Sequence, residues 1–255
     1  MKKYALLFLL LIAFTGIMSA QTPVLDHFRC YLVPTAPTLA VSVRLQDQFD
    51  SPTGLFENIT SLVAVRFCNP DRKVVNGVVT PIVNPAHHLT MYVINQQPVV
   101  SRTAVISNQF GTQNLVLADA RFLLVPTGKG VPPNPAPSPS TDLDHYKCYA
   151  ASGANLNRGN VALSDQFIAE TITVLQPVLF CNPVLKIHGN VTTPILHPSA
   201  HLTCYATSAS HFTGVTVNTR NQFSVAALAV RQPDLLCVPS TKLSWAVTAP
   251  AGSGI

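Results

Sequence analysis

Four short segments of the chain alternate apolar and polar side chains with a period of two and share one pattern. They are HFRCYL from His27, HLTMYV from His88, HYKCYA from His145 and HLTCYA from His201. In each, the cysteine or methionine lies on one face with apolar residues, and the histidine and tyrosine lie on the other. Because alternate side chains of a strand point to opposite faces, the pattern predicts four equivalent β-strands with the cysteine facing a core.

Two further strands are expected in every copy. One ends at a [DN]QF triplet, as in VSVRLQDQF (41–49), and the other precedes a second cysteine position, as in ALAVRQPDLLC (227–237). No long segment has the 3.6-residue period of a helix. Three strands per copy give about twelve strands in all, and therefore an all-β fold.

The spacing between these markers is constant from copy to copy. The first cysteine position follows the histidine by three residues, and the Gln of the triplet comes eighteen residues later. The second cysteine position follows after fifteen more, except in the first copy, which carries a five-residue insertion between Phe49 and Phe67. A Pro and then a Lys close each copy, so the chain contains a fourfold internal repeat. The four units are 26–73, 87–129, 144–186 and 200–242.

The units are expected to form two domains. Units one and two are joined by VVNGVVTPIVNPA (74–86), and units three and four by the similar IHGNVTTPILHPSA (187–200). Between the pairs lies GVPPNPAPSPSTDL (130–143), whose prolines predict a stiff, extended linker. We therefore expect two tandem β-sandwich or small-barrel domains, 21–129 and 144–255, each a pseudo-twofold pair of three-stranded units that folds independently.

The repeat also predicts how the six cysteines pair. Units one, three and four keep both cysteine positions, whereas unit two has lost both, to Met91 and Leu124. Joint loss is expected of a bonded pair, because a single survivor would be a free thiol. The C-x₂-C spacing of a zinc site is absent. The predicted disulfides are Cys30–Cys68, Cys148–Cys181 and Cys204–Cys237.

The first twenty residues predict a Sec-type signal peptide. Lys2 and Lys3 precede the apolar segment 5–17, which is too short for a membrane span, and Ala20 suits signal peptidase cleavage. The mature chain has no apolar run of membrane-spanning length, so we expect a secreted or periplasmic protein. Charged residues make up only 11% of the chain and form no basic cluster, which argues against a nucleic-acid partner.

The series DHFRCY…DQF…FCNP…HHLTMY…NQF…LLVP, followed by DHYKCY…DQF…FCNP…AHLTCY…NQF…LLCVPSTK, resembles a family of secreted bacterial repeat domains of unknown function. The resemblance covers nearly all of 26–242. It departs from the family pattern at Met91 and Leu124, where cysteines would be expected. The resemblance implies a bacterial, exported origin and carries no activity, substrate or catalytic residue.

The repeated His and Tyr side chains form a candidate ligand face: His27, Tyr31, His88, Tyr92, His145, Tyr149, His201 and Tyr205. The alternative is that this face is covered and maintains the fold, which is favoured because it recurs in all four units. A weaker candidate is a metal site at His188, His197 and His201, but Pro198 breaks any helix that would align them, and no metal or cofactor is expected.

Two other repeated residue types could carry chemistry. The Lys that ends each unit and the Asp or Asn of each triplet could form isopeptide bonds, but a solvated Lys and a turn-capping Asx explain them more simply. Glu57 and Glu170 are the two glutamates after the leader and do not occupy matched positions, so a carboxylate-pair hydrolase is not expected.

The sequence favours a non-catalytic structural or interaction protein. The alternative is a ligand-binding module, with carbohydrate as the first candidate ligand, and an enzyme of unrecognised type comes third because the common catalytic motifs are missing. The partner is unknown, with a protein or a glycan as candidates. An exposed His/Tyr face would favour ligand binding, and a covered one a structural role.

Overall fold

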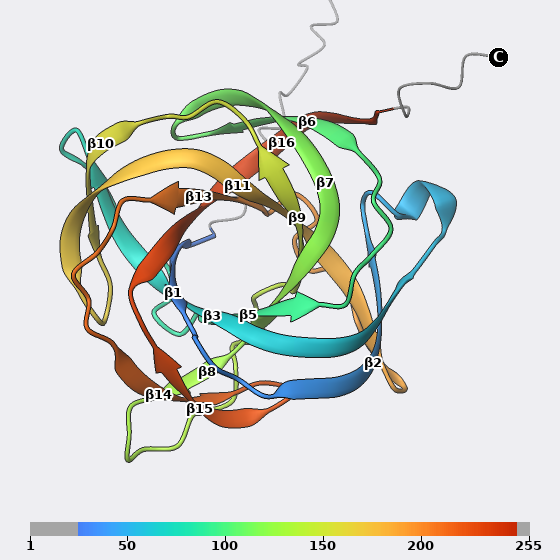
Figure 1. Cartoon of the computed structure of the whole chain (residues 1–255), viewed down its shortest axis with the longest axis horizontal. Coiled ribbons are helices and arrows are strands. Elements are labelled where there is room, and N and C mark those ends of the chain that lie inside the picture. The colour runs from blue at the N-terminus through green and yellow to red at the C-terminus, as the bar shows by residue number, and fades with distance from the viewer. Residues whose placement is uncertain (1–24, 249–255) are drawn as a thin grey trace, which may run out of the picture.

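The computed structural model describes residues 25–248, and they form an almost wholly β structure (Figure 1). The predicted all-β class is confirmed, since sixteen strands are accompanied by one 3₁₀ turn, η1 (Ser51–Thr53). Within 25–248 no helix has the length and apolarity of a membrane span. The predicted signal peptide at 1–20 lies outside the described residues.

Eight strands close into an antiparallel ring around a common axis (Figure 1). In ring order they are β1 (His27–Leu32), β3 (Glu57–Val75), β5 (Leu89–Ile94), β7 (Gly111–Pro126), β9 (Tyr146–Ser152), β11 (Ala169–His188), β13 (His201–Thr207) and β16 (Pro233–Val247). Each pairs with the next, and β16 pairs with β1. The four HxxCY strands therefore alternate with the long strands that carry the second cysteine positions.

The cysteine face of each HxxCY strand fills the interior of the ring, as its alternation predicts. Phe28, Leu89, Tyr146 and Leu202 pack there together with the six cysteines. The three disulfides join the pairs expected from the repeat, Cys30–Cys68, Cys148–Cys181 and Cys204–Cys237, with Cα atoms 4.0, 4.0 and 3.9 Å apart. In unit two, Met91 lies directly opposite Leu124, at the register that the bonded cysteines occupy elsewhere.

Replacing both Met91 and Leu124 with cysteine is expected to create a fourth disulfide. The pair has the register of the native bridges, and its cross-link would stabilise the fold by about 3 kcal/mol through loop closure. Peptide mapping of the unreduced variant, together with urea unfolding, measures both outcomes. Either single substitution is the control and should leave one buried free thiol. A mispaired product containing any of the six native cysteines would contradict the equivalence of the four units.

Four outer strands connect units that are not neighbours in sequence. They are β2 (Thr38–Asp47), β6 (Arg102–Asn108), β10 (Arg158–Ser164) and β14 (Val215–Arg220). On one side each pairs with the long strand of its own unit, which in unit four is split into β15 (Val225–Val230) and β16. On the other side β2, β10 and β6 each pair with the end of the long strand two units away, which is β11, β3 and β16 in turn. β14 pairs with β8 (Gly128–Gly130), the short strand that follows the long strand β7 of unit two.

These pairings correct the expected division at 130–143. Strands of 21–129 and of 144–255 belong to one 13-stranded sheet, and a second sheet of β15, β14 and β8 also combines both halves. The hairpin strands β4 (Val78–Thr80) and β12 (Val191–Thr193) extend β3 and β11. The described residues therefore form one interlocked fold rather than two tandem sheets, because units one and three, and units two and four, exchange strand partners.

The proline-rich segment 130–143 is also more closely packed than an extended linker. It folds back over β8, where Asn218 Nδ2 donates a hydrogen bond to the carbonyl oxygen of Asn134 (2.7 Å). Glycine permits this approach, since a Cβ on Gly128 would overlap the carbonyl oxygen of Pro137, and one on Gly130 would lie 2.5 Å from that of Pro135. A stretch rich in proline can thus belong to the folded body when the strand beneath it turns glycines toward it.

Candidate functional site

The histidine and tyrosine of every HxxCY strand are buried. No one of the eight is more than 8% exposed, because the outer strands cover this face: His27, Tyr31, His88, Tyr92, His145, Tyr149, His201 and Tyr205. The candidate ligand face of the sequence is therefore closed to solvent. Both faces of the HxxCY strands belong to packed cores, so the alternation marks two interiors instead of an inside and an outside.

Each tyrosine is hydrogen-bonded to the Asp or Asn of the [DN]QF triplet two units away. The hydroxyls donate to aspartates in one diagonal pair of units and accept from asparagines in the other. The four bonds are Tyr31 to Asp165 (2.7 Å), Tyr149 to Asp47 (2.9 Å), Asn108 to Tyr205 (2.8 Å) and Asn221 to Tyr92 (2.8 Å). They join the same units that exchange strands, so hydrogen bonds and sheet pairing support one diagonal arrangement.

The Asx residues also cap their own turns, as the sequence predicts. Asp47 Oδ1, for example, accepts from the backbone N–H of Phe49 (2.9 Å). The other oxygen of Asp47 accepts from Asn182 of the opposite CNP motif (2.9 Å). Where the triplet begins with Asn108, the CNP asparagine is absent and Ser240 accepts instead (3.1 Å). When the triplet residue changes from Asp to Asn, its hydrogen-bond partner two units away changes as well, from a donor to an acceptor. The buried triplet side chain is therefore hydrogen-bonded in both cases.

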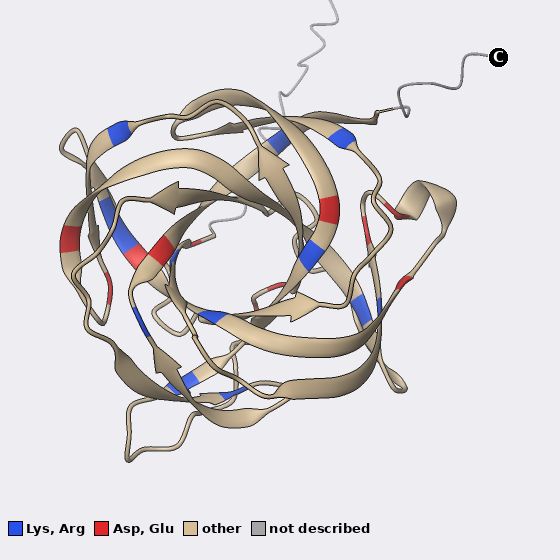
Figure 2. Cartoon of the chain, viewed as in Figure 1, with Lys and Arg blue, Asp and Glu red and all other residues tan. Residues whose placement is uncertain are grey.

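Two buried cations belong to this diagonal. Charged residues are few and dispersed over the fold (Figure 2), yet Lys147 is fully buried, with Nζ 3.1 Å from Glu57 and 3.5 Å from Asp47, and in contact with Asp50. Burial lowers the pKa of Lys147, but these carboxylates outweigh burial and raise it above its usual value. The cluster therefore holds a charged ammonium in the interior.

Arg29 is the equivalent residue of unit one and forms an ion pair with Glu170. Glu57 lies opposite Leu45, and Glu170 lies opposite Leu163, three residues before the Gln of each triplet. The expectation that the two glutamates are unmatched is therefore wrong. The insertion that contains η1 precedes Glu57 and shifts its number without changing its register. Both glutamates serve as counter-ions of buried cations.

The three histidines of the candidate metal site have separate neighbours. His188 packs against Phe223, and His201 packs against Phe180. His197 Nδ1 lies 3.2 Å from Asp144. Among residues 25–248 no group of three or more His, Cys, Asp or Glu side chains has an arrangement that could hold a metal. The HPSAH spacing thus reflects a turn between units three and four.

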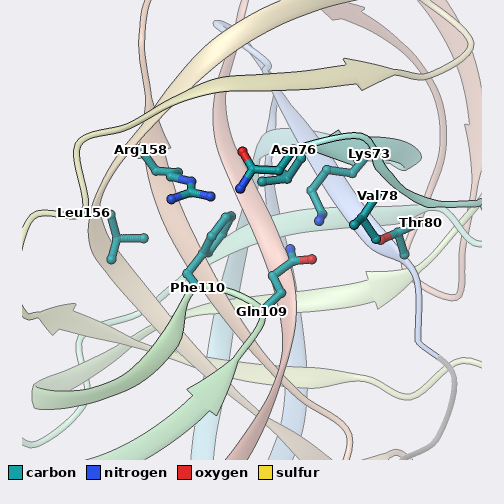
Figure 3. A pocket seen from close by; sticks show the side chains of 9 residues that line it. Lys73, Asn76, Val78, Thr80, Gln109, Phe110, Leu156 and Arg158 are labelled. Carbon is teal, nitrogen blue, oxygen red and sulfur yellow. The ribbon is translucent and has the colours of Figure 1, made fainter.

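A cavity of about 510 Å³ lies where units one, two and three meet (Figure 3). Its described lining combines two cations, two amides, a hydroxyl and apolar side chains, without a carboxylate. The lining residues are Lys73, Val75, Asn76, Val78, Thr80, Gln109, Phe110, Leu156 and Arg158. In Figure 3, Lys73 and Gln109 point toward one another, and Arg158 lies beside Phe110. The pairing of β10 with the end of β3 brings Arg158 and Lys73 to one site.

Lys73 differs from its counterparts in the other units. Lys129 and Lys242 donate to the amide oxygens of Asn69 and Asn182 (3.1 and 2.9 Å). Lys73 is 3% exposed, and no side-chain acceptor for Nζ lies among residues 25–248. Burial lowers its pKa to about 8, against the opposing effect of Asp71. The expectation of solvated lysines is therefore wrong, since none of the four is freely exposed.

Comparison with known protein families identifies the repeat. A family described as a repeat of unknown function, DUF7450, matches residues 88–239, which is more than half of the chain. The chain belongs to the DUF7450 family. No curated protein and no solved structure matches it. The DUF7450 match extends across the 130–143 segment.

The sequence of this DUF7450 chain does not predict the buried polar contacts, because each joins residues that lie two units apart. Asp47, Asp165, Lys147 and Arg29 all belong to markers that the repeat contains, and no signal along the chain pairs them. The available signal was the alternation of unit types. Two residues after the histidine of the HxxCY strand, units one and three have a cation that is buried, Arg29 or Lys147, whereas units two and four have Thr90 and Thr203.

Acid is expected to destabilise this DUF7450 chain through its buried histidines. Burial, and secondly the lysine of the same unit, lowers the pKa to about 4 for His27 and about 3 for His88, His145 and His201. The unfolded chain binds these protons near pH 6.5 and the folded chain does not. Stability from the neutral rings is therefore complete above pH 6.5 and is lost as the pH falls toward 3–4.

The measurement is urea unfolding between pH 4.5 and 7.5 in the wild type and in His88→Gln. Because burial raises the pKa of Asp71 to about 8, this group acts in the opposite sense, and comparison with the variant isolates the histidine. The slope of the unfolding free energy against pH should be smaller in the variant than in the wild type. The difference is at most the contribution of one proton, roughly 1.4 kcal/mol per pH unit. An unchanged slope would show that His88 titrates normally in the folded protein.

Proposed function

We propose that this protein is an exported, disulfide-stapled structural or interaction protein without a catalytic role. The observation that carries the proposal is the burial of all eight repeated His and Tyr side chains. The tyrosines are hydrogen-bonded between diagonal units, and two of the histidines bond to triplet glutamines, Gln109 and Gln222. Side chains that usually perform chemistry maintain the fold here.

The disulfides support an oxidising location. Cytosolic thiols are normally kept reduced, whereas all six cysteines of this chain are bonded and none is free among the described residues. The predicted signal peptide at 1–20 would deliver the chain to such a compartment. A closed ring leaves few strand edges for unwanted pairing, which suits a protein that must persist outside the cell.

Exposed aliphatic side chains at matched positions of units one and three support the interaction part of the proposal. Val78 is 69% exposed at the start of β4, and Val191 is 65% exposed at the matching start of β12. Val83 and Leu196, 47% and 46% exposed, repeat the match five residues later. Exposed aliphatic residues at matched positions of units one and three offer a surface for a partner.

The test is expression of the full chain in a bacterium with an oxidising periplasm. The exported product should begin at Gln21, and its intact mass should rise by six hydrogens on reduction. It should also show no hydrolysis of chromogenic glycoside, ester and peptide substrates above buffer. Retention of an uncleaved, reduced chain in the cytoplasm would contradict export, and turnover lost in a single-residue variant would contradict the non-catalytic role.

A further inference from the structure

We propose that the cavity between units one, two and three binds a small hydroxylated carboxylate, with a hexuronic acid or a short acidic sugar as the ligand class. The proposal rests on the lining residues and is independent of the structural function proposed above. A volume of about 510 Å³ suits a monosaccharide or disaccharide, since small-molecule sites commonly enclose roughly 300–1,000 Å³.

The charge of the cavity selects an anion. Lys73 and Arg158 are the charged residues among its described lining, and neither forms an ion pair with a described residue. Lys73 is 3% exposed as a residue, and its Nζ lies 6.0 Å from the centre of the Phe110 ring without a described hydrogen-bond acceptor, so it is available to a negative group in the cavity. Arg158 supplies a planar fork that matches the two oxygens of a carboxylate.

The matching position in unit three shows what Lys73 lacks. Lys186 Nζ donates to Gln222 Oε1 (2.6 Å), and Gln222 Nε2 lies 3.1 Å from His145 Nε2. The Lys186 ammonium therefore already has a hydrogen-bond acceptor within the protein. Gln109 likewise lies 2.8 Å from His27, but Lys73 forms no hydrogen bond with it. A ligand oxygen would therefore take the position beside Lys73 that the amide oxygen takes beside Lys186.

Arg158 is specific to this cavity. It lies eight residues before Gln166, and the other units have Ala40, Ser101 and Gly214 at that offset. A fold-maintaining residue would be expected to recur, whereas a binding residue is added to one copy. Arg158 thus lines the same cavity as Lys73, which among the four unit-ending lysines is the one without a described hydrogen-bond acceptor.

The remaining walls suit the body of a sugar. Phe110 offers an aromatic ring to the apolar face of a pyranose, and Leu156 and Val78 add apolar surface elsewhere in the lining. Asn76 and Thr80 provide amide and hydroxyl groups for the sugar hydroxyls. Asn76 (φ 50°) and Gly77 (φ 77°) adopt the left-handed conformations of a tight hairpin turn, which fixes Asn76 at the cavity.

Titration calorimetry of the purified, oxidised protein tests the proposal. The probes are D-glucuronate, D-galacturonate, the neutral sugars glucose and galactose, and inorganic sulfate. We expect at least one uronate to bind and the matching neutral sugar to bind at least about tenfold more weakly, because it lacks the charge-assisted contacts. Sulfate should bind more weakly than the uronate, because it cannot contact Phe110 and Asn76 together.

Lys73→Gln and Arg158→Gln should each weaken uronate binding at least about tenfold, and Lys186→Gln is the matched control that should leave it unchanged. The side chains of Lys73 and Arg158 make no described hydrogen bond, so both variants should fold, which a thermal melt verifies. Absence of binding by both uronates, equal binding of neutral sugars, equal binding of sulfate, or full affinity in both site variants would overturn the proposal.

Discussion

Neither half of the chain is expected to fold when 25–138 and 139–248 are produced separately. Division removes the pairing of β1 with β16 and of β7 with β9, which opens the ring. It also removes the diagonal partners of all four outer strands and four tyrosine hydrogen bonds. Circular dichroism and thermal melts of each fragment should show no cooperative transition, and mixing of the fragments under oxidising conditions should restore one.

A nick in the folded protein is the matched control. Each disulfide lies within one half, so no covalent bond would join the fragments after cleavage within 130–143. The nicked protein should nevertheless elute as one species, because sheet pairing holds the halves together. A cooperative melt from either isolated half would show that the halves are separate domains, as the repeat alone suggests.

Replacing Lys147 with methionine is expected to destabilise the protein by about 3–5 kcal/mol. The substitution keeps the apolar volume and leaves Asp47, Asp50 and Glu57 close together without their cation, and an uncompensated buried charge is costly. Denaturant unfolding at pH 7 measures the loss.

Adding Asp47→Asn and Glu57→Gln to this variant should restore part of the stability, because the remaining cluster then carries less charge. Arg121→Ala, which removes an exposed ion pair with Asp119, is the surface control and should change stability by less than about 0.5 kcal/mol. A Lys147 variant as stable as this control would mean that the carboxylates bind protons in the folded protein.

The unit, its strands and its disulfides could be predicted because they depend on local spacing. Period-two alternation identified the strand containing Cys30, and the joint absence of cysteine at Met91 and Leu124 identified bonded partners. The partners of β2 and its equivalents could not be found this way. Alternation shows which face of a strand is buried, but it does not say which strand lies beside it.

The sequence nevertheless contained a clue to the diagonal arrangement. Units one and three share CNP and a triplet that begins with Asp, and units two and four share a triplet that begins with Asn. By itself this alternation is equally compatible with two consecutive domains of similar design. In the structure it reflects hydrogen bonds such as Asn182 to Asp47, in which each partner lies two units from the other.

The cavity could not be predicted from the sequence for a related reason. Lys73 ends unit one, Gln109 belongs to unit two and Arg158 begins an outer strand of unit three. No motif joins them, and each residue alone looks like a surface polar side chain. Only the pairing of β10 with β3 makes them neighbours.

Diagonal pairing also restricts how a gene encoding this chain can evolve. A solenoid repeat can gain or lose one copy at an end, because each copy contacts only its neighbours. Here each outer strand needs a partner two units away within a closed circle. Duplication or deletion of one unit would break that circle and leave an outer strand without its partner. Viable descendants should therefore vary in their loops, such as the insertion at η1, while the number of units stays fixed.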